Sequence, residues 1–129
     1  MKIEIYFQKF KDIIDSNPFV FSSEILFDKR SSYQGFIRAD VYLRDNSTLH
    51  IREFIDVELQ PDRFMYAYQY MSPSGDFIFR YDNTGHHRKL GLSTYPHHKH
   101  QTTESNILPS NNPDLRDILE EISRIMKWP

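Results

Sequence analysis

The chain has 129 residues, of which 39% are hydrophobic and 15% aromatic, and its formal net charge is −2. This length and composition exclude a disordered chain and predict a single domain over residues 1–129 with a buried core. No apolar run approaches the roughly 18 residues of a membrane helix, and the start Met-Lys-Ile-Glu-Ile lacks the pattern of a signal peptide, so we expect a cytoplasmic protein.

The first predicted element is an amphipathic helix over residues 3–15, which Asn17-Pro18 ends. After it the apolar residues recur at every second position, which is typical of strands. Turn sequences at 45–47 and 72–75 separate neighbouring strands. The strand candidates cover residues 19–27, 37–43, 49–57, 64–70 and 77–81.

A second helix is predicted over residues 113–126, with Asn112 as its N-cap and Pro113 at its first position. Its apolar residues form one stripe, as in a helix that covers a sheet. The fold class predicted is therefore α+β, a mostly antiparallel meander of about five to six strands with both helices on one face.

Five of the six histidines fall between His86 and His100, in a long connection of the kind that is usually functional. Residues 79–100 carry four basic residues against Asp82 alone, a net charge of +3, while the remainder sums to −5. Clustered imidazoles indicate acid–base chemistry, metal binding or anion capture, because imidazole exchanges protons near neutral pH and binds metals. Some of these histidines could equally be solvated loop residues.

If residues 96–100 are extended, His98 and His100 share one side and His97 takes the other. As an acid and a base, His98 and His100 would move the protons of RNA cleavage, while Arg80 and Lys99 balance the phosphate charge. As metal ligands, His86, His98 and His100 would join a carboxylate around a divalent ion, since the chain has no cysteine. Spacing alone does not separate the two readings.

Glu53 lies among apolar residues on one face of its predicted strand, so we expect its carboxylate to point inward with a raised pKa. The alternatives are a salt bridge to an inward arginine, or a bulge that turns Glu53 outward. The tyrosines Tyr66, Tyr68 and Tyr70 also share a face; cross-strand packing in the core explains them better than base stacking. For Arg80 and Asp82 the alternative to a functional role is a mutual ion pair.

Several segments of the chain are similar to those of the TumE family of bacterial toxin–antitoxin proteins. The specific part is an Arg-Tyr-Asp-Asn run followed by a His-His pair and then Pro-His-His-Lys-His. The chain departs from the family pattern at one place: Asn83-Thr-Gly-His86 stands where a proline is expected just before the His-His pair. The matching segments are Asn17-Pro18-Phe19-Val20, Tyr33-Gln-Gly-Phe-Ile37, Leu49-His-Ile-Arg-Glu-Phe54, Tyr66-Ala-Tyr68, Phe79-Arg-Tyr-Asp-Asn83, His86-His87 and Pro96-His-His-Lys-His100.

The resemblance implies the toxin half of a two-gene module, neutralised by a small DNA-binding antitoxin encoded beside it. It assigns no reaction. The acidic remainder of the chain is one surface that a basic antitoxin could cover.

Together these observations predict an endoribonuclease toxin that needs no cofactor and acts on RNA, with no membrane partner and a homodimer left open. The alternatives are a metal-dependent hydrolase or nuclease, and a non-enzymatic toxin that binds and blocks its target. The catalytic candidates are His98, His100, Glu53, which would orient a histidine, His97 and His87; the substrate-binding candidates are Arg80, Lys99, Arg88 and Tyr81.

Overall fold

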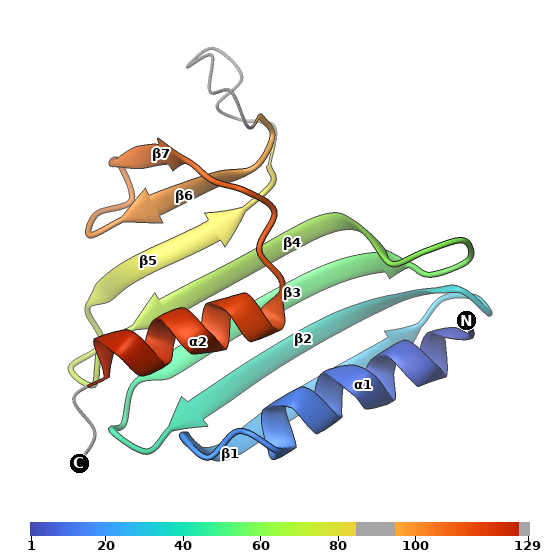
Figure 1. Ribbon diagram of the computed structural model, residues 1–129, viewed down its shortest axis with the longest axis horizontal. Coiled ribbons are helices and arrows are strands. Elements are labelled where there is room, and N and C mark those ends of the chain that lie inside the picture. Colours follow the sequence, from blue (N-terminus) through green and yellow to red (C-terminus); the bar gives the residue numbers. More distant parts are fainter. Residues whose placement is uncertain (85–94, 127–129) are drawn as a thin grey trace.

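A computed structural model describes residues 1–84 and 95–126 of the chain. It consists of one antiparallel sheet with a helix from each end of the sequence packed on it (Figure 1). The elements in chain order are α1 (Ile3–Asp15), β1 (Val20–Lys29), β2 (Gln34–Leu43), β3 (Thr48–Asp56), β4 (Asp62–Met71), β5 (Phe77–Asp82), β6 (His98–Gln101), β7 (Ile107–Pro109) and α2 (Leu115–Ile125).

The sheet is a meander in which every strand pairs with its sequence neighbours, in the order β1-β2-β3-β4-β5-β6-β7. The predicted α+β class is therefore confirmed. The sheet is somewhat larger than predicted, because seven strands pair where five to six were expected. The added strands β6 and β7 are only four and three residues long, too short to show a clear alternation of apolar residues.

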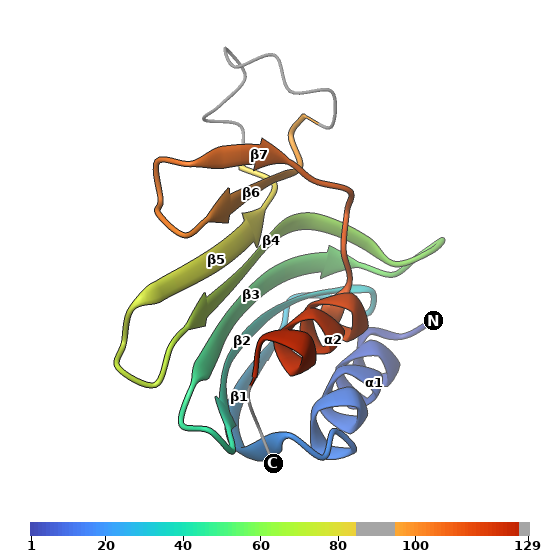
Figure 2. The same ribbon diagram turned by 60° about the vertical axis from the view of Figure 1, so that its left-hand side comes forward.

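Both helices cover the same face of the sheet, as predicted, and no other element of the described residues covers the opposite face (Figure 2). Every second residue of the central strands is buried under the helices, because strand side chains alternate between the two faces. The core residues contributed by the helices are Ile3, Phe7, Phe10 and Ile14 of α1 and Leu115, Ile118, Leu119 and Ile122 of α2. We call the opposite surface the open face.

Helix α2 begins two residues later than predicted. Asp114, not Asn112, is its N-cap: the Asp114 side chain accepts a hydrogen bond from the Asp117 backbone, and the Asp117 side chain accepts one from Asp114. This reciprocal capping box satisfies two backbone N–H groups at once. Asn112 instead accepts a hydrogen bond from Arg63.

The register shifts at three places in the described sheet, and two of these shifts explain exposed phenylalanines. The register shifts between Phe54 and Ile55, which pair with Met65 and Arg63, so Phe64 is an extra residue in β4. An extra residue reverses which face the following side chains occupy. Phe64 is accordingly 53% exposed, although the sequence pattern placed it with the buried tyrosines. A second shift, between Val20 and Ser22, leaves Phe21 exposed in the same way.

None of the helices in the described part of the chain is long and apolar enough to cross a membrane.

Candidate functional site

The open face carries two parallel rows of polar side chains that run across five strands. The strand register places Arg38, Arg52, Ala67, Asp82 and His98 in one row. The next row consists of Asp40, His50, Gln69, Arg80 and His100. Over β2 to β5 these rows line a groove of about 580 Å³. Ala67 has the smallest side chain in the two rows, so it leaves room in the groove between its cross-strand neighbours Arg52 and Asp82.

Two arginines stand directly opposite each other in this open-face groove. Arg38 and Arg52 are cross-strand partners, and both are exposed. Within residues 1–84 and 95–126 neither side chain forms an ion pair or a hydrogen bond. Like charges that face each other across two strands destabilise a sheet. An anion between the two guanidinium groups would relieve this repulsion, so the pair favours phosphate binding.

His50 and Asp40 form a hydrogen-bonded pair in the same groove. The Nδ1 atom of His50 lies 2.5 Å from Oδ1 of Asp40, and the two side chains are 49% and 38% exposed. A carboxylate can only accept, so Nδ1 carries the proton and the lone pair of the neutral ring is on Nε2. This is the tautomer that a general base requires, with the carboxylate holding the ring in place.

His50 was not among the residues predicted from the sequence, because it lies outside the segment in which the other five histidines cluster. A turn predicted at 45–47 would pair residue 40 with residue 52. In the structure the turn closes one residue earlier, with a backbone hydrogen bond from Leu43 to Ser47, and this register pairs Asp40 with His50.

At the β5–β6 end of the groove, Asp82 is surrounded by His98, His100 and Arg80. Oδ1 of Asp82 lies 2.7 Å from Nε2 of His98, and Oδ2 lies 3.3 Å from Nε2 of His100 and 3.0 Å from Nε of Arg80. His98 and His100 are 1% and 2% exposed. They share one side of the strand, as predicted, and the Arg80–Asp82 ion pair is also present.

Backbone carbonyls fix the orientation of these two histidine rings. Nδ1 of His98 donates to the oxygen of Pro96 at 2.8 Å, and Nδ1 of His100 donates to the oxygen of Glu104 at 2.7 Å. Nε2 of each ring is therefore the nitrogen that faces Asp82. Burial lowers the pKa of His100, and the charge of Arg80 lowers it further.

The ionised form of Asp82 is stabilised despite its burial. Desolvation alone would raise the pKa of Asp82, but hydrogen bonds from the Thr84 backbone and from Arg80, with the charge of His98, outweigh it and lower this pKa. The cluster thereby fixes Arg80, whose Nη1 also donates to Gln69 at 3.3 Å and to Glu104 at 3.1 Å. Arg80 is the member of the cluster that lines the groove.

The other predicted substrate-binding residues lie elsewhere. Lys99 and Tyr81 occupy the helix-covered face, where Nζ of Lys99 donates to Glu121 at 2.9 Å and the Tyr81 hydroxyl donates to the same carboxylate at 2.5 Å. They are separated from Arg80 because adjacent residues of a strand point to opposite faces. Arg88, and with it His86 and His87, falls outside the described residues.

His97 takes the side opposite His98 and His100, as predicted, and this is the helix-covered face, where its Nδ1 lies 2.8 Å from the Tyr66 hydroxyl. Burial lowers the pKa of His97 and raises that of Tyr66 to about 12. Since Tyr66 stays protonated, its hydroxyl donates to the imidazole.

Glu53 points inward and is 1% exposed, as expected. Its carboxylate accepts hydrogen bonds from the hydroxyls of Tyr6 at 2.6 Å and Tyr68 at 2.5 Å, and burial raises its pKa. Within the described chain its hydrogen-bond donors are these tyrosines, so the expected contact with a histidine is not found there.

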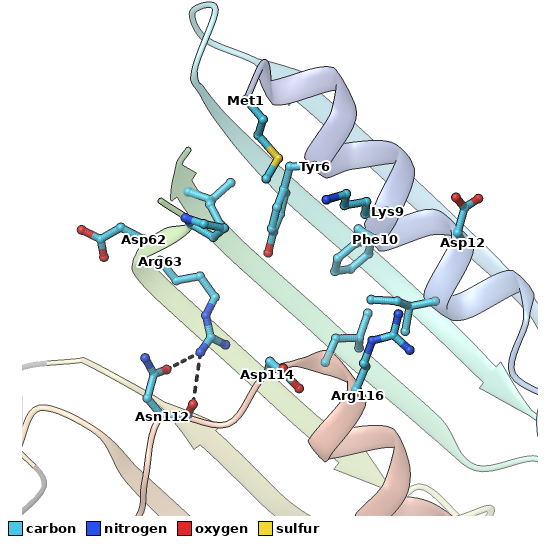
Figure 3. Close-up of a pocket in the computed structure, with 14 residues that line it drawn as sticks. Met1, Tyr6, Lys9, Phe10, Asp12, Asp62, Arg63, Asn112, Asp114 and Arg116 are labelled. Atoms are coloured by element: carbon cyan, nitrogen blue, oxygen red, sulfur yellow. Dashed lines mark hydrogen bonds between the residues drawn. The ribbon is translucent and has the colours of Figure 1, made fainter. Parts of the chain in front are cut away.

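Arg63 extends the Glu53 network to the linker before α2. Its guanidinium donates to the Tyr68 hydroxyl and to the carbonyl of Pro113, both at 2.7 Å. It also donates to Asn112, the contact drawn in Figure 3. A pocket of about 650 Å³ lies beside it, between α1 and the start of α2. The bonds of Arg63 tie the linker to the sheet, which favours a structural role for this network.

Comparison with known families decides the identity of the chain. A family model described as toxin TumE matches residues 10–126. The chain belongs to the TumE toxin family. No match was found among curated proteins or among solved structures.

As a member of the TumE family the chain is the toxin of a toxin–antitoxin pair, and an antitoxin is its implied partner. Two of the segments that carry the family resemblance line the open-face groove: 49–54 with His50 and Arg52, and 79–83 with Arg80. A third, 96–100, pairs with β5 beside the groove. The groove is therefore our candidate active site of this TumE toxin.

Proposed function

We propose that this TumE toxin is an endoribonuclease that cleaves RNA in the open-face groove. The observation that carries the proposal is the meeting of the His50–Asp40 pair with Arg38, Arg52 and Arg80 in one groove. A base beside a cluster of cations suits phosphoryl transfer, in which the oxygens around phosphorus carry the negative charge of the transition state. RNA as the substrate places the action of the toxin in the cytoplasm.

In the proposed reaction, Nε2 of His50 takes the proton of a ribose 2′-hydroxyl. The 2′ oxygen then forms a bond to phosphorus, the bond from phosphorus to the 5′ oxygen breaks, and that oxygen takes a proton from a water molecule, which regains one from the protonated His50. Arg52 and Arg80 balance the charge on the non-bridging oxygens. The products are a 2′,3′-cyclic phosphate and a 5′-hydroxyl.

This assignment changes the role expected for His98 and His100. All four of their ring nitrogens already face Asp82 or a backbone carbonyl, and both rings are buried. We propose that they act through Asp82 as positioning residues, which hold Arg80 toward the groove. The acid–base role predicted for them from the sequence is the competing hypothesis.

A metal-dependent reaction is the second candidate, favoured by one observation. The ligand atoms of Asp82, His98 and His100 lie within 4.8 Å of one another, and backbone carbonyls hold Nδ1 of both histidines as in many metal sites. Arg80, however, already places a cation 3.0 Å from the Asp82 carboxylate. Chelation distinguishes the two candidates.

The test is incubation of purified toxin with RNA, with and without chelator, followed by mapping of the fragment ends. We expect cleavage that survives chelation and leaves cyclic phosphates. His50→Ala should lower the rate by roughly 10²- to 10⁴-fold, the range for loss of a general base. Asp40→Asn should lower it as well, whereas the matched Asp15→Asn, on an exposed helix position, should not.

Two results would overturn the proposal. Cleavage that persists in folded His50→Ala but disappears in His98→Gln, His100→Gln would return catalysis to the buried histidines. Growth arrest with no cleaved RNA would favour the non-enzymatic reading, in which the toxin binds and blocks its target.

A further inference from the structure

A partly exposed aromatic patch of Phe36, Phe54 and Phe64 lies on the open face beside the groove. Phe36 and Phe54 meet edge to face with ring centroids 4.4 Å apart, and Phe64 stacks on Phe54 at 5.6 Å. Arg30 lies over the Phe36 ring at 4.7 Å. The helices cover the opposite face, so packing of the core does not account for these rings.

The β4 bulge creates part of this patch. In a regular strand Phe64 would share the buried face of Tyr66, but the extra residue turns it outward onto Phe54. The same shift turns Arg63 toward Tyr68 on the helix side. Bulges re-aim side chains and are frequent beside functional sites.

The aromatic patch is continuous with the opposed arginines. Phe36 pairs with Phe54, and the next pair on the same face is Arg38 with Arg52. Same-face neighbours along a strand are about 7 Å apart, which is within the reach of one nucleotide. Arg38 and Arg52 also line a second depression with Phe36 and Met65, so they stand between the aromatic patch and the groove.

We propose that the patch and the arginine pair bind unpaired RNA next to the bond that the groove cleaves. A base stacks on Phe64 and Phe54, and its phosphate lies between Arg38 and Arg52. Aromatic strand faces bind bases this way, because every base has a π-face and unpaired bases are free to turn outward. In a duplex the same base faces are covered by their neighbours. This inference rests on the proposed function for the position of the bond and makes single-stranded RNA the substrate class.

The test measures binding separately from cleavage, by fluorescence anisotropy of labelled 10-nucleotide RNA on the His50→Ala variant. Probes are the single strand, the same sequence as a duplex, and an abasic strand with the same phosphates. We expect the single strand to bind best. Phe64→Ser should weaken it by roughly 5- to 100-fold, as for loss of one stacked base. The matched control is Leu59→Ser, because Leu59 is 96% exposed but lies outside the patch.

Equal binding of the abasic and normal strands, tighter binding of the duplex, or no effect of Phe64→Ser would each overturn the inference. Two other results for Phe64→Ser would also overturn it, provided that RNA binding is retained: conversion of a dimer to a monomer in analytical ultracentrifugation, or loss of antitoxin binding. In either case the patch would belong to a protein interface. If the wild type fails to cleave RNA yet shows the expected stacking, the proposed reaction fails and the binding site stands.

Discussion

Replacement of Asp82 by alanine should destabilise this toxin far more than an average substitution. The Asp82 carboxylate accepts from Arg80 Nε at 3.0 Å and from the backbone and hydroxyl of Thr84 at 3.1 and 3.0 Å, and it faces two imidazoles. Alanine leaves Arg80 and both histidines around an apolar methyl group, in a site that water barely reaches.

The expected cost follows from that geometry. Breaking a fully buried ion pair by removing one partner costs about 3–5 kcal/mol. Arg80 is 25% exposed and keeps its ion pair with Glu104, so we expect a cost at the lower end of that range, about 3 kcal/mol. In a domain of this size each kcal/mol lowers Tm by roughly 3–5 °C, so we expect a Tm about 9–15 °C lower. Asp82→Asn keeps the shape and one acceptor for Thr84, and should cost about 1–3 kcal/mol.

Urea denaturation of the wild type, Asp82→Ala and Asp82→Asn measures these differences. The matched control is Asp76→Ala, since Asp76 is exposed in the β4–β5 turn and should change stability by less than about 0.5 kcal/mol. A loss below about 1 kcal/mol in Asp82→Ala would refute the view that this carboxylate holds the cluster together.

Three further predictions concern other parts of the structure. Burial raises the pKa of Glu53 above the ordinary 4.5, so the folded chain keeps this proton where the unfolded chain loses it. The free energy of unfolding of the wild type, relative to that of Glu53→Gln, should therefore fall as pH rises above 4.5. Urea titrations of both proteins at several pH values measure this difference, and a difference that stays constant with pH would contradict the prediction. Ala67→Phe should fill the groove and lower kcat/KM for RNA at least about tenfold. Its Tm should stay unchanged, because Ala67 lies on the face of the sheet away from the helices. Unimpaired cleavage would exclude the groove as the active site. Arg52→Gln removes one of two opposed like charges, so thermal denaturation should show an unchanged or higher Tm. The slope of log K for RNA binding against log salt concentration should become shallower by about one unit. A lower Tm with an unchanged slope would argue against an anion site.

Much of the fold was predictable because the relevant signals are local. Alternation of apolar residues marks the central strands, and helical spacing marks both helices. Alternation also predicted correctly that Glu53 points inward and that His98 and His100 share a side. The start of α2 was misplaced because Asn112 and Asp114 are both good N-caps, and the choice depends on Asp117 and on the bond that Arg63 makes to Asn112.

The candidate site was predictable only in part, since its residues come from different strands. His50 becomes a candidate base through its contact with Asp40, which lies on the neighbouring strand and directly opposite it in the β2–β3 register. The bulge that turns Phe64 outward changes one backbone step and leaves no mark in the hydrophobic pattern.

The sequence by itself determined the class of fold, the face on which most strand residues lie, and the toxin family. Periodicity and short motifs carry this information, and both are properties of neighbouring residues. Only the tertiary structure decided which charges meet: Arg38 with Arg52, His50 with Asp40, and Asp82 with two histidines. Strand register and bulges set those contacts, and register is a property of paired strands that no single segment encodes.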